Sequence, residues 1–330
     1  MADDEHPEIR TFATMAEIRA LEGFKENNGV TKENYERLFG DYDLPEEEAK
    51  CCFQKPNGVL CGEDHKWGFV ALLKDKSLTI VGNVCVRDRF GEDAAIKKDR
   101  TRYLNAKRRQ ERKARLHELI AGKDTALARL ELLKGRLAAI ETRVQGFLTN
   151  LGDGTVRRLH NMARSANASV SVDAITYKEY IDEEGHKQTE RRVSPSRLGS
   201  FNGLTVLNDH TFSSVRKDIG DVLRAYARTE VLGDDIKLSE LGRITMILGS
   251  TDRIAEEIEK LERDVAAFLG NDPILLCFLI DDRTERYKAA KFALELLGET
   301  GGKDRAKAWL AEKEQELRKA LSADKVSIRI

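Results

Sequence analysis

The chain has 330 residues, of which 41% are hydrophobic and 34% are charged, and its formal net charge is −1. A charged fraction above the usual quarter favours long, solvent-exposed helices, and no apolar run is long enough to cross a bilayer, which argues against a membrane protein. Five cysteines, an odd number, argue against the disulfide framework of a secreted protein, and the acidic start MADDEHPEIR is unlike a secretory signal. We therefore expect a cytoplasmic protein.

The spacing of apolar residues predicts an α+β fold that is mostly helical. The expected parts are an acidic helical segment (1–50), a zinc-binding β-hairpin module (51–95), a long basic and heptad helix (96–151), a small β-rich insertion (152–210) and a helical C-terminal domain (211–330) with a second heptad helix at 237–270. Within the first part, we expect short helices between residues 14 and 40, one of them starting at Thr31, and another after Pro45.

Residues 51–92 differ in character from the helical segments on either side. Pro56-Asn57-Gly58 is a tight-turn signal, and two apolar runs, 69–73 and 78–81, are separated by four polar residues. This arrangement predicts a β-hairpin.

Four of the five cysteines fall in or beside this hairpin, together with one histidine. The predicted zinc ligands are Cys52, Cys61, His65 and Cys85. Three thiolates and one imidazole complete the tetrahedron of a structural zinc site, which has no open position. Gly62 would let the backbone turn tightly between two nearby ligands. Cys51 is an alternative to Cys52, because adjacent strand residues point to opposite sides.

The layout of residues 52–90 resembles the treble-clef group of zinc-binding folds. Both have a knuckle with a cysteine, here Cys61-Gly62, then a hairpin, then a ligand near the start of a helix, here Cys85. The resemblance implies a structural Zn²⁺ ion. The sequence departs from the group because Cys52 lies far upstream and only one ligand lies near the helix.

A helix is predicted at 97–115 with ten basic and two acidic residues. Charge runs nearly around this helix, as in helices that meet a polyanion or solvent. We expect nucleic acid to contact Arg102, Lys107, Arg108, Arg109, Arg112 and Lys113. The alternative is contact within the chain, because residues 1–50 carry fourteen acids and six bases.

Apolar residues recur at alternating steps of three and four from Leu116 to Leu151 and again from Ile244 to Phe268. These are heptad seams, which keep one stripe of a helix against a partner helix. We expect the first seam to lie on a helix spanning 97–151, with Gly122 as a point where it can break, and the two seams to pair as an antiparallel hairpin. The alternative is self-association, which would make the protein an oligomer or a scaffold for a protein partner.

The remaining elements are assigned by shorter patterns. Residues 169–181 and 187–193 read as two strands around the turn 182–185, and 325–330 reads as an edge strand. Helices are expected at 211–233, 283–297 and 304–321, the short run 274–280 fits strand or helix, and Cys277 is a core residue.

Three carboxylates follow that short run. Asp281, Asp282 and Glu285 could hold Mg²⁺ for a nuclease or another phosphoryl-transfer enzyme, although Asp282 is also well placed to cap a helix that starts at Arg283. No complete catalytic motif is present in the sequence. The leading hypothesis is therefore a non-enzymatic, zinc-containing protein that binds a macromolecule, most simply DNA or RNA, and does not bind membranes.

Overall fold

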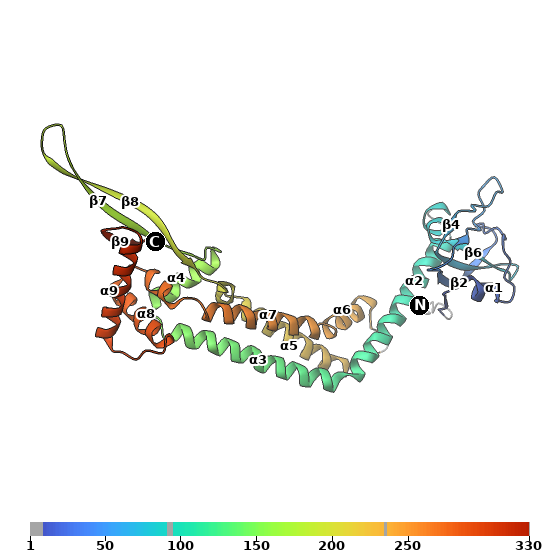
Figure 1. Ribbon diagram of the computed structural model, residues 1–330. Helices are drawn as coiled ribbons and strands as arrows, with labels where there is room; N and C mark the ends of the chain where they lie inside the picture. The colour runs from blue at the N-terminus through green and yellow to red at the C-terminus, as the bar shows by residue number, and fades with distance from the viewer. Residues whose placement is uncertain (1–8, 91–94, 234–235, 330) are drawn as a thin grey trace. The chain divides into compact units, whose positions relative to one another are not determined.

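The computed structural model describes residues 9–90, 95–233 and 236–329 (Figure 1). The chain divides into two compact units, one formed by 1–120 with 232–246 and the other by 121–231 with 247–330. The fold is α+β, as expected, with several separate sheets. No described helix combines the length and the apolar character needed to cross a bilayer.

The first unit is built on a four-stranded sheet. Its elements are β1 (Thr11–Phe12), α1 (Met15–Arg19), β2 (Tyr35–Asp43), β3 (Ala49–Lys50), β4 (Asp64–His65), β5 (Trp67–Leu73), β6 (Leu78–Gly82), the one-turn helix η1 (Cys85–Arg89) and α2 (Ala95–Ala121). The strand order is β1-β2-β5-β6, and β5 and β6 form the antiparallel hairpin expected from the two apolar runs.

The prediction of helices between residues 31 and 48 was wrong. Tyr35, Leu38 and Phe39 have a helix-like spacing, but β2 pairs along its length with β5, and that pairing decides the conformation. Thr31 Oγ1 accepts the N–H of Asn34 at 3.3 Å within a local turn that leads into the strand. After Pro45 the chain enters β3 rather than a helix.

Helix α2 closes the apolar core of the first unit. Ile96 and Tyr103 are buried in it, and the Tyr103 hydroxyl donates to the carbonyl of Arg10 at 2.8 Å. Asp99 Oδ2 accepts the N–H of Leu38 at 2.7 Å and the hydroxyl of Tyr35 at 2.5 Å. The N-terminal half of α2 is thereby held against β2.

The second unit combines helices with a long β-ribbon. Its elements are α3 (Lys123–Thr149), α4 (Asp153–Arg164), β7 (Ser169–Ile181), β8 (Lys187–Ser200), η2 (Leu204–Leu207), α5 (Thr211–Thr229), α7 (Thr251–Leu269), η3 (Pro273–Phe278), α8 (Arg283–Leu296), α9 (Lys303–Ala320) and β9 (Lys325–Ile328). Helix α6 (Leu238–Leu248) begins in the first unit and ends in the second.

The two heptad seams are buried, but the predicted antiparallel hairpin was wrong. Ion pairs Arg129–Asp252 and Arg136–Glu262 show that α3 and α7 run in the same direction. Helix α5 runs the opposite way beside α3, as the pairs Arg216–Glu141 and Lys123–Glu230 show. A heptad pattern records which face is buried but not the direction of the partner helix.

Helix boundaries follow the local signals closely. The expected helix at 97–151 breaks at Gly122 into α2 and α3, and the helix expected at 237–270 breaks between Leu248 and Thr251. Residues 274–278, ambiguous in sequence, lie in the 3₁₀ helix η3, where Cys277 is fully buried. The insertion predicted to be β-rich also contains the helix α4.

Candidate metal centre

The metal centre begins with a short antiparallel ladder between residues 49–54 and 60–65. Ala49 pairs with His65, and the amide of Cys61 donates to the carbonyl of Phe53 at 2.7 Å. The turn at Pro56-Asn57-Gly58 closes the ladder, with Gly58 at φ 85°. Gly62 has φ 66°, a left-handed conformation that glycine adopts without strain. This ladder brings Cys51 and Cys61 to neighbouring positions.

The third cysteine comes from the end of the hairpin. Strand β6 lies beside β3, where the amide of Cys52 donates to the carbonyl of Ile80 at 3.1 Å. The chain then turns into η1, whose first residue is Cys85. The amide of Gly82 donates to Cys51 Sγ at 3.4 Å, which ties the hairpin exit to the ladder.

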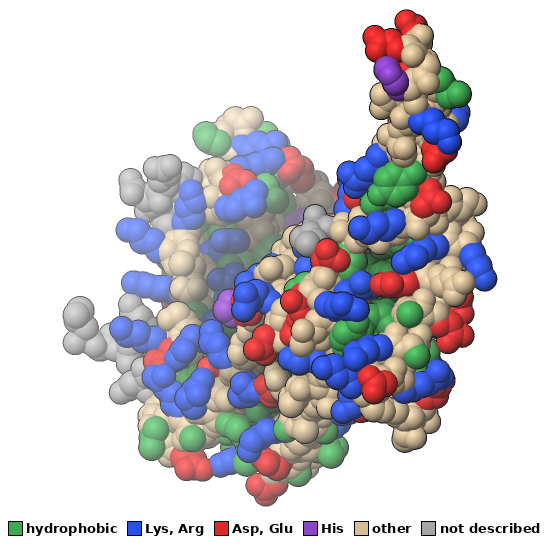
Figure 2. All heavy atoms as spheres, turned by 90° about the vertical axis from the view of Figure 1, so that its left-hand side faces the viewer, with side chains coloured by type: hydrophobic (Ala, Val, Ile, Leu, Met, Phe, Trp, Pro, Cys, Tyr) green, Lys and Arg blue, Asp and Glu red, His purple; other side chains and the backbone are tan. Residues whose placement is uncertain are grey.

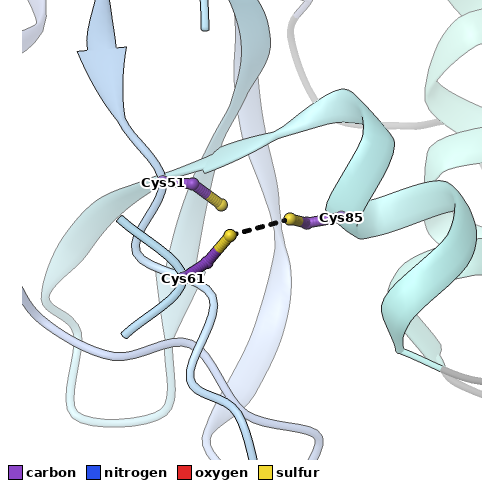
Figure 3. Close-up of side chains that lie close together, drawn as sticks. All are labelled: Cys51, Cys61 and Cys85. Carbon is purple, nitrogen blue, oxygen red and sulfur yellow. Dashed lines mark hydrogen bonds between the residues drawn. The ribbon is translucent and has the colours of Figure 1, made fainter. Parts of the chain in front are cut away.

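Three thiols from these three segments converge (Figure 3). The Sγ atoms of Cys51, Cys61 and Cys85 all lie within 4.8 Å of one another, and those of Cys61 and Cys85 are 3.6 Å apart. Zn–S bonds of 2.3 Å in a tetrahedron place sulfur atoms about 3.8 Å apart. The three thiols therefore have the spacing that one ion requires, and the cluster can hold a metal.

Charged groups surround the cluster on its exposed side. Arg89, four residues after Cys85, donates to Cys61 Sγ at 2.8 Å and to Glu63 Oε1 at 2.6 Å. Cys51 and Cys85 are each 2% exposed, whereas Cys61 is half-buried. A guanidinium beside the outermost sulfur offsets the negative charge that thiolate ligands bring.

Hydrogen bonding favours a thiolate at the centre of the cluster. The Cys85 thiol and the Gly82 amide lower the pKa of Cys51, to about 5. The same pairing with Cys51, together with burial, raises the pKa of Cys85. Because metal ligands must be deprotonated, the cluster starts with one ligand already in the form that a metal binds.

Two of the four predicted ligands, Cys61 and Cys85, lie in the cluster, and Cys51 takes the place of Cys52. The side chain of Cys52 points into a separate apolar core with Met15 and Tyr42, and its Sγ lies 3.6 Å from the carbonyl of Lys50. This is the alternation of adjacent strand residues that left the choice open in sequence.

His65, the fourth predicted ligand, is not among the clustered groups. Its Nε2 lies 2.5 Å from the hydroxyl of Tyr42, and its Nδ1 lies 3.1 Å from the carbonyl of Glu63. The ring nevertheless packs on Gly82, the residue whose amide donates to Cys51, because a Cβ at position 82 would lie 3.2 Å from the ring. Tyr42 is distant in sequence, so no local signal reveals this contact.

The basic residues predicted to bind nucleic acid lie on α2, but several contact the protein itself. Lys107 forms an ion pair with the buried carboxylate of Asp41. Arg109 and Arg112 donate to the carbonyls of Ile236 and Leu238 at 3.0 and 2.8 Å. Arg102 and Arg108 are exposed, and Lys113 is half-buried.

The carboxylates considered for a magnesium site have other contacts. Asp282 caps α8 by accepting the amide of Glu285 at 2.9 Å. Glu285 Oε2 accepts the amides of Gly154 and Thr155 at the start of α4, at 3.0 and 3.2 Å. Asp281 is exposed.

Comparison of the chain with protein-family models, with curated proteins and with solved structures finds no match.

Proposed function

We propose that Cys51, Cys61 and Cys85 bind a structural Zn²⁺ ion that holds the first unit in its folded form. The observation that carries this proposal is the convergence of three thiols, two from the ladder and one from η1, at a spacing close to that of tetrahedral zinc ligands. Two of the sulfur atoms are buried and the third is in contact with Arg89, an arrangement that suits a closed structural site better than an open catalytic one.

His65 is the fourth ligand in this proposal. Its ring lies against Gly82, beside Cys51, so a change of side-chain rotamer would direct a ring nitrogen toward the cluster. The cost is the contact with Tyr42, which the metal bond would replace. The resulting Cys₃His set is one of the common structural zinc sites.

Cobalt substitution tests the ligand set. We expect the protein to bind one Co²⁺ with the intense visible absorption of tetrahedral coordination and the near-ultraviolet bands of thiolate ligation, and Zn²⁺ to displace it. His65→Asn should weaken Co²⁺ binding and alter the visible bands. Octahedral spectra without thiolate bands would contradict the zinc proposal. Unchanged spectra in His65→Asn would exclude His65 as a ligand and leave the three cysteines in place.

The second part of the proposal is that the module presents α2 to a nucleic acid. Asp99, the acid among residues 97–110, is turned inward to Tyr35 and Leu38. The outward face of the same stretch carries the exposed side chains of Lys98, Arg102 and Arg108. A group of exposed bases on one helix suits phosphate groups, whose binding does not depend on base sequence.

The metal centre and this basic face are adjacent in the first unit. Burial, followed by the neighbouring charges of Arg87 and Arg108, lowers the pKa of Arg100. Arg87 belongs to η1, the turn that Cys85 begins. An ion bound at Cys85 would therefore fix η1 and the position of Arg87, a base whose charge acts on Arg100 of α2.

Binding of labelled duplex DNA and single-stranded RNA to the full chain tests this part. Reversal of charge at Lys98, Arg102 and Arg108 together should abolish the salt-dependent electrophoretic shift of the labelled nucleic acid. Reversal at Lys288, Lys291 and Lys303, three exposed lysines of the second unit, is the matched control and should leave it in place. An absence of binding at low salt, or an equal loss in both triple variants, would end the nucleic-acid proposal.

A further inference from the structure

No described strand lies beside the distal half of the β7–β8 ribbon. β7 and β8 pair from Ser169↔Ser200 to Ile181↔Lys187, whereas β9 covers only Val172–Ile175. Figure 2 shows the ribbon projecting from the body of the second unit, with acidic side chains at its tip and basic ones lower down. Two-stranded ribbons are marginally stable in water, and a third strand stabilises them.

The register identifies which backbone groups of β8 are unpaired. The amides of Asp324 and Arg329 donate to the carbonyls of Ile175 and Ser171, so the odd-numbered residues of β7 face β9. Its even-numbered residues therefore face β8. Across the ladder, the same register directs the backbone polar groups of Val193 and the other odd-numbered residues from 187 to 197 away from β7, toward an edge that no described strand pairs with.

The other edge of the ribbon is less available. Asp324 Oδ2 accepts the amide of Tyr177 at 2.7 Å, just beyond the end of β9. On β8, Pro195 lies opposite Asp173 at an outward-facing position, so it breaks no bond to β7 but leaves one bond to an added strand unmade. Apart from Pro195, the outward-facing backbone groups of β8 between residues 187 and 197 have no described strand partner.

A cavity of about 290 Å³ is lined in part by Leu198, near the C-terminal end of β8. Gly199 pairs with Val170 and Arg197 with Ser171, so the intervening Leu198 is the extra residue of a β-bulge. Bulges redirect side chains, and Leu198 lines the cavity. The rest of the lining comes from η3 and α9: Ile274, Leu275, Phe278, Lys313, Glu316, Leu317 and Ala320. The mostly apolar lining suits one large apolar side chain.

The charge of β8 limits what can pair with it. The strand carries four basic residues and one acidic residue. Arg191 and Arg197 are exposed, and no described acidic side chain forms an ion pair with either. Like charges opposite each other destabilise a strand pair. A second copy of β8 would bring another net positive charge to this edge, whereas an acidic strand would be attracted.

We propose that this edge binds an extended, acidic segment of a partner protein, which adds as a third strand beside β8 and inserts one large apolar side chain into the cavity. Main-chain hydrogen bonds supply affinity in this mode of recognition, and the pocket and the charges supply specificity. The proposal is independent of the metal centre, because all its residues belong to the second unit.

Synthetic peptides test the proposal on the full-length protein. The probe is a fluorescent peptide in which glutamate alternates with valine and one central valine is replaced by phenylalanine. We expect saturable binding, a Kd roughly tenfold or more higher when the phenylalanine becomes alanine, and no binding when lysine replaces glutamate. Amide resonances of Val193 and Arg197 should shift on titration.

Two tryptophan variants on α9 separate the cavity from the helix that lines it. Ala320→Trp should fill the cavity and reduce the affinity for the phenylalanine peptide to that for the alanine peptide. Ala311→Trp, at an exposed position outside the lining, is the control and should bind as the wild type does. An absence of saturable binding, equal binding of the lysine peptide, or an Ala320→Trp variant that binds normally would overturn the proposal.

Discussion

Cys61 Sγ and Cys85 Sγ lie 3.6 Å apart, although 24 positions separate the two residues in sequence. The loop between them contains β4, β5 and β6, so an ion shared by these thiols would close two of the four strands of the first unit's main sheet into one ring. Metal bonds that close long loops stabilise a fold mainly by restricting the unfolded chain. The metal centre should therefore control the stability of the first unit much more than that of the second.

Removal of the metal tests this difference, and the two tryptophans report on it separately. Trp67 lies in the first unit and Trp309 in the second. A chelator should lower the free energy of unfolding reported by Trp67 in a Trp309→Phe variant by at least about 3 kcal/mol, the linkage for free metal at roughly a hundredfold above Kd. The free energy of unfolding reported by Trp309 in a Trp67→Phe variant should not change. Equal decreases in both variants would contradict the expected difference between the two units.

Asp99 is expected to stabilise the first unit through its two hydrogen bonds. In Asp99→Asn the charge-assisted bonds from Tyr35 and Leu38 become neutral or are lost. The free energy of unfolding should fall by about 1–3 kcal/mol, measured with urea and Trp67 fluorescence. Asn105→Ala, at an exposed position on the same helix, is the control and should be near neutral.

Glu285 should act as a structural anchor for α4. Glu285→Ala leaves the amides of Gly154 and Thr155 without their acceptor. We expect a loss of about 1–2 kcal/mol in the stability of the second unit, as for other caps of helix N-termini. Asp281→Ala, whose side chain is exposed, should have little effect. Mg²⁺-dependent cleavage of nucleic acid that both variants abolish would instead support the phosphoryl-transfer alternative.

Cys277 should make the second unit less stable at alkaline pH. Burial raises the pKa of this thiol to about 12, whereas an unfolded cysteine titrates near 8.5. Between these values the unfolded chain has released a proton that the folded chain retains, so stability is complete below the lower value and falls as pH rises. The slope should be up to about 1.4 kcal/mol per pH unit. The slope should be shallower in Cys277→Ala than in the wild type, and identical slopes in both proteins would refute the assignment.

Local signals predicted much of the fold. Gly122 ends one helix and precedes the next, Asp282 caps α8, and the turn at 182–185 joins β7 to β8. Each of these depends on a few neighbouring residues. The heptad seams also identified the buried faces of α3 and α7.

The errors share a physical cause, which is that distant partners decided the outcome. β2 has a helix-like spacing but pairs with β5, and α3 runs parallel to α7 because α5 returns the chain between them. Prediction of the candidate ligands from sequence is limited for the same reason. Which of two adjacent cysteines faces Cys85 depends on how β3 lies against β6, and the contact of His65 with Tyr42 depends on β2.

The most direct test of the metal centre compares Cys51→Ser with Cys52→Ser. The two cysteines are adjacent and both are buried, but only Cys51 points toward Cys61 and Cys85. Native mass spectrometry of the purified proteins should find one zinc ion in the wild type and in Cys52→Ser, and none in Cys51→Ser. Loss of zinc from Cys52→Ser with retention in Cys51→Ser, or no zinc in the wild type, would contradict the proposed site.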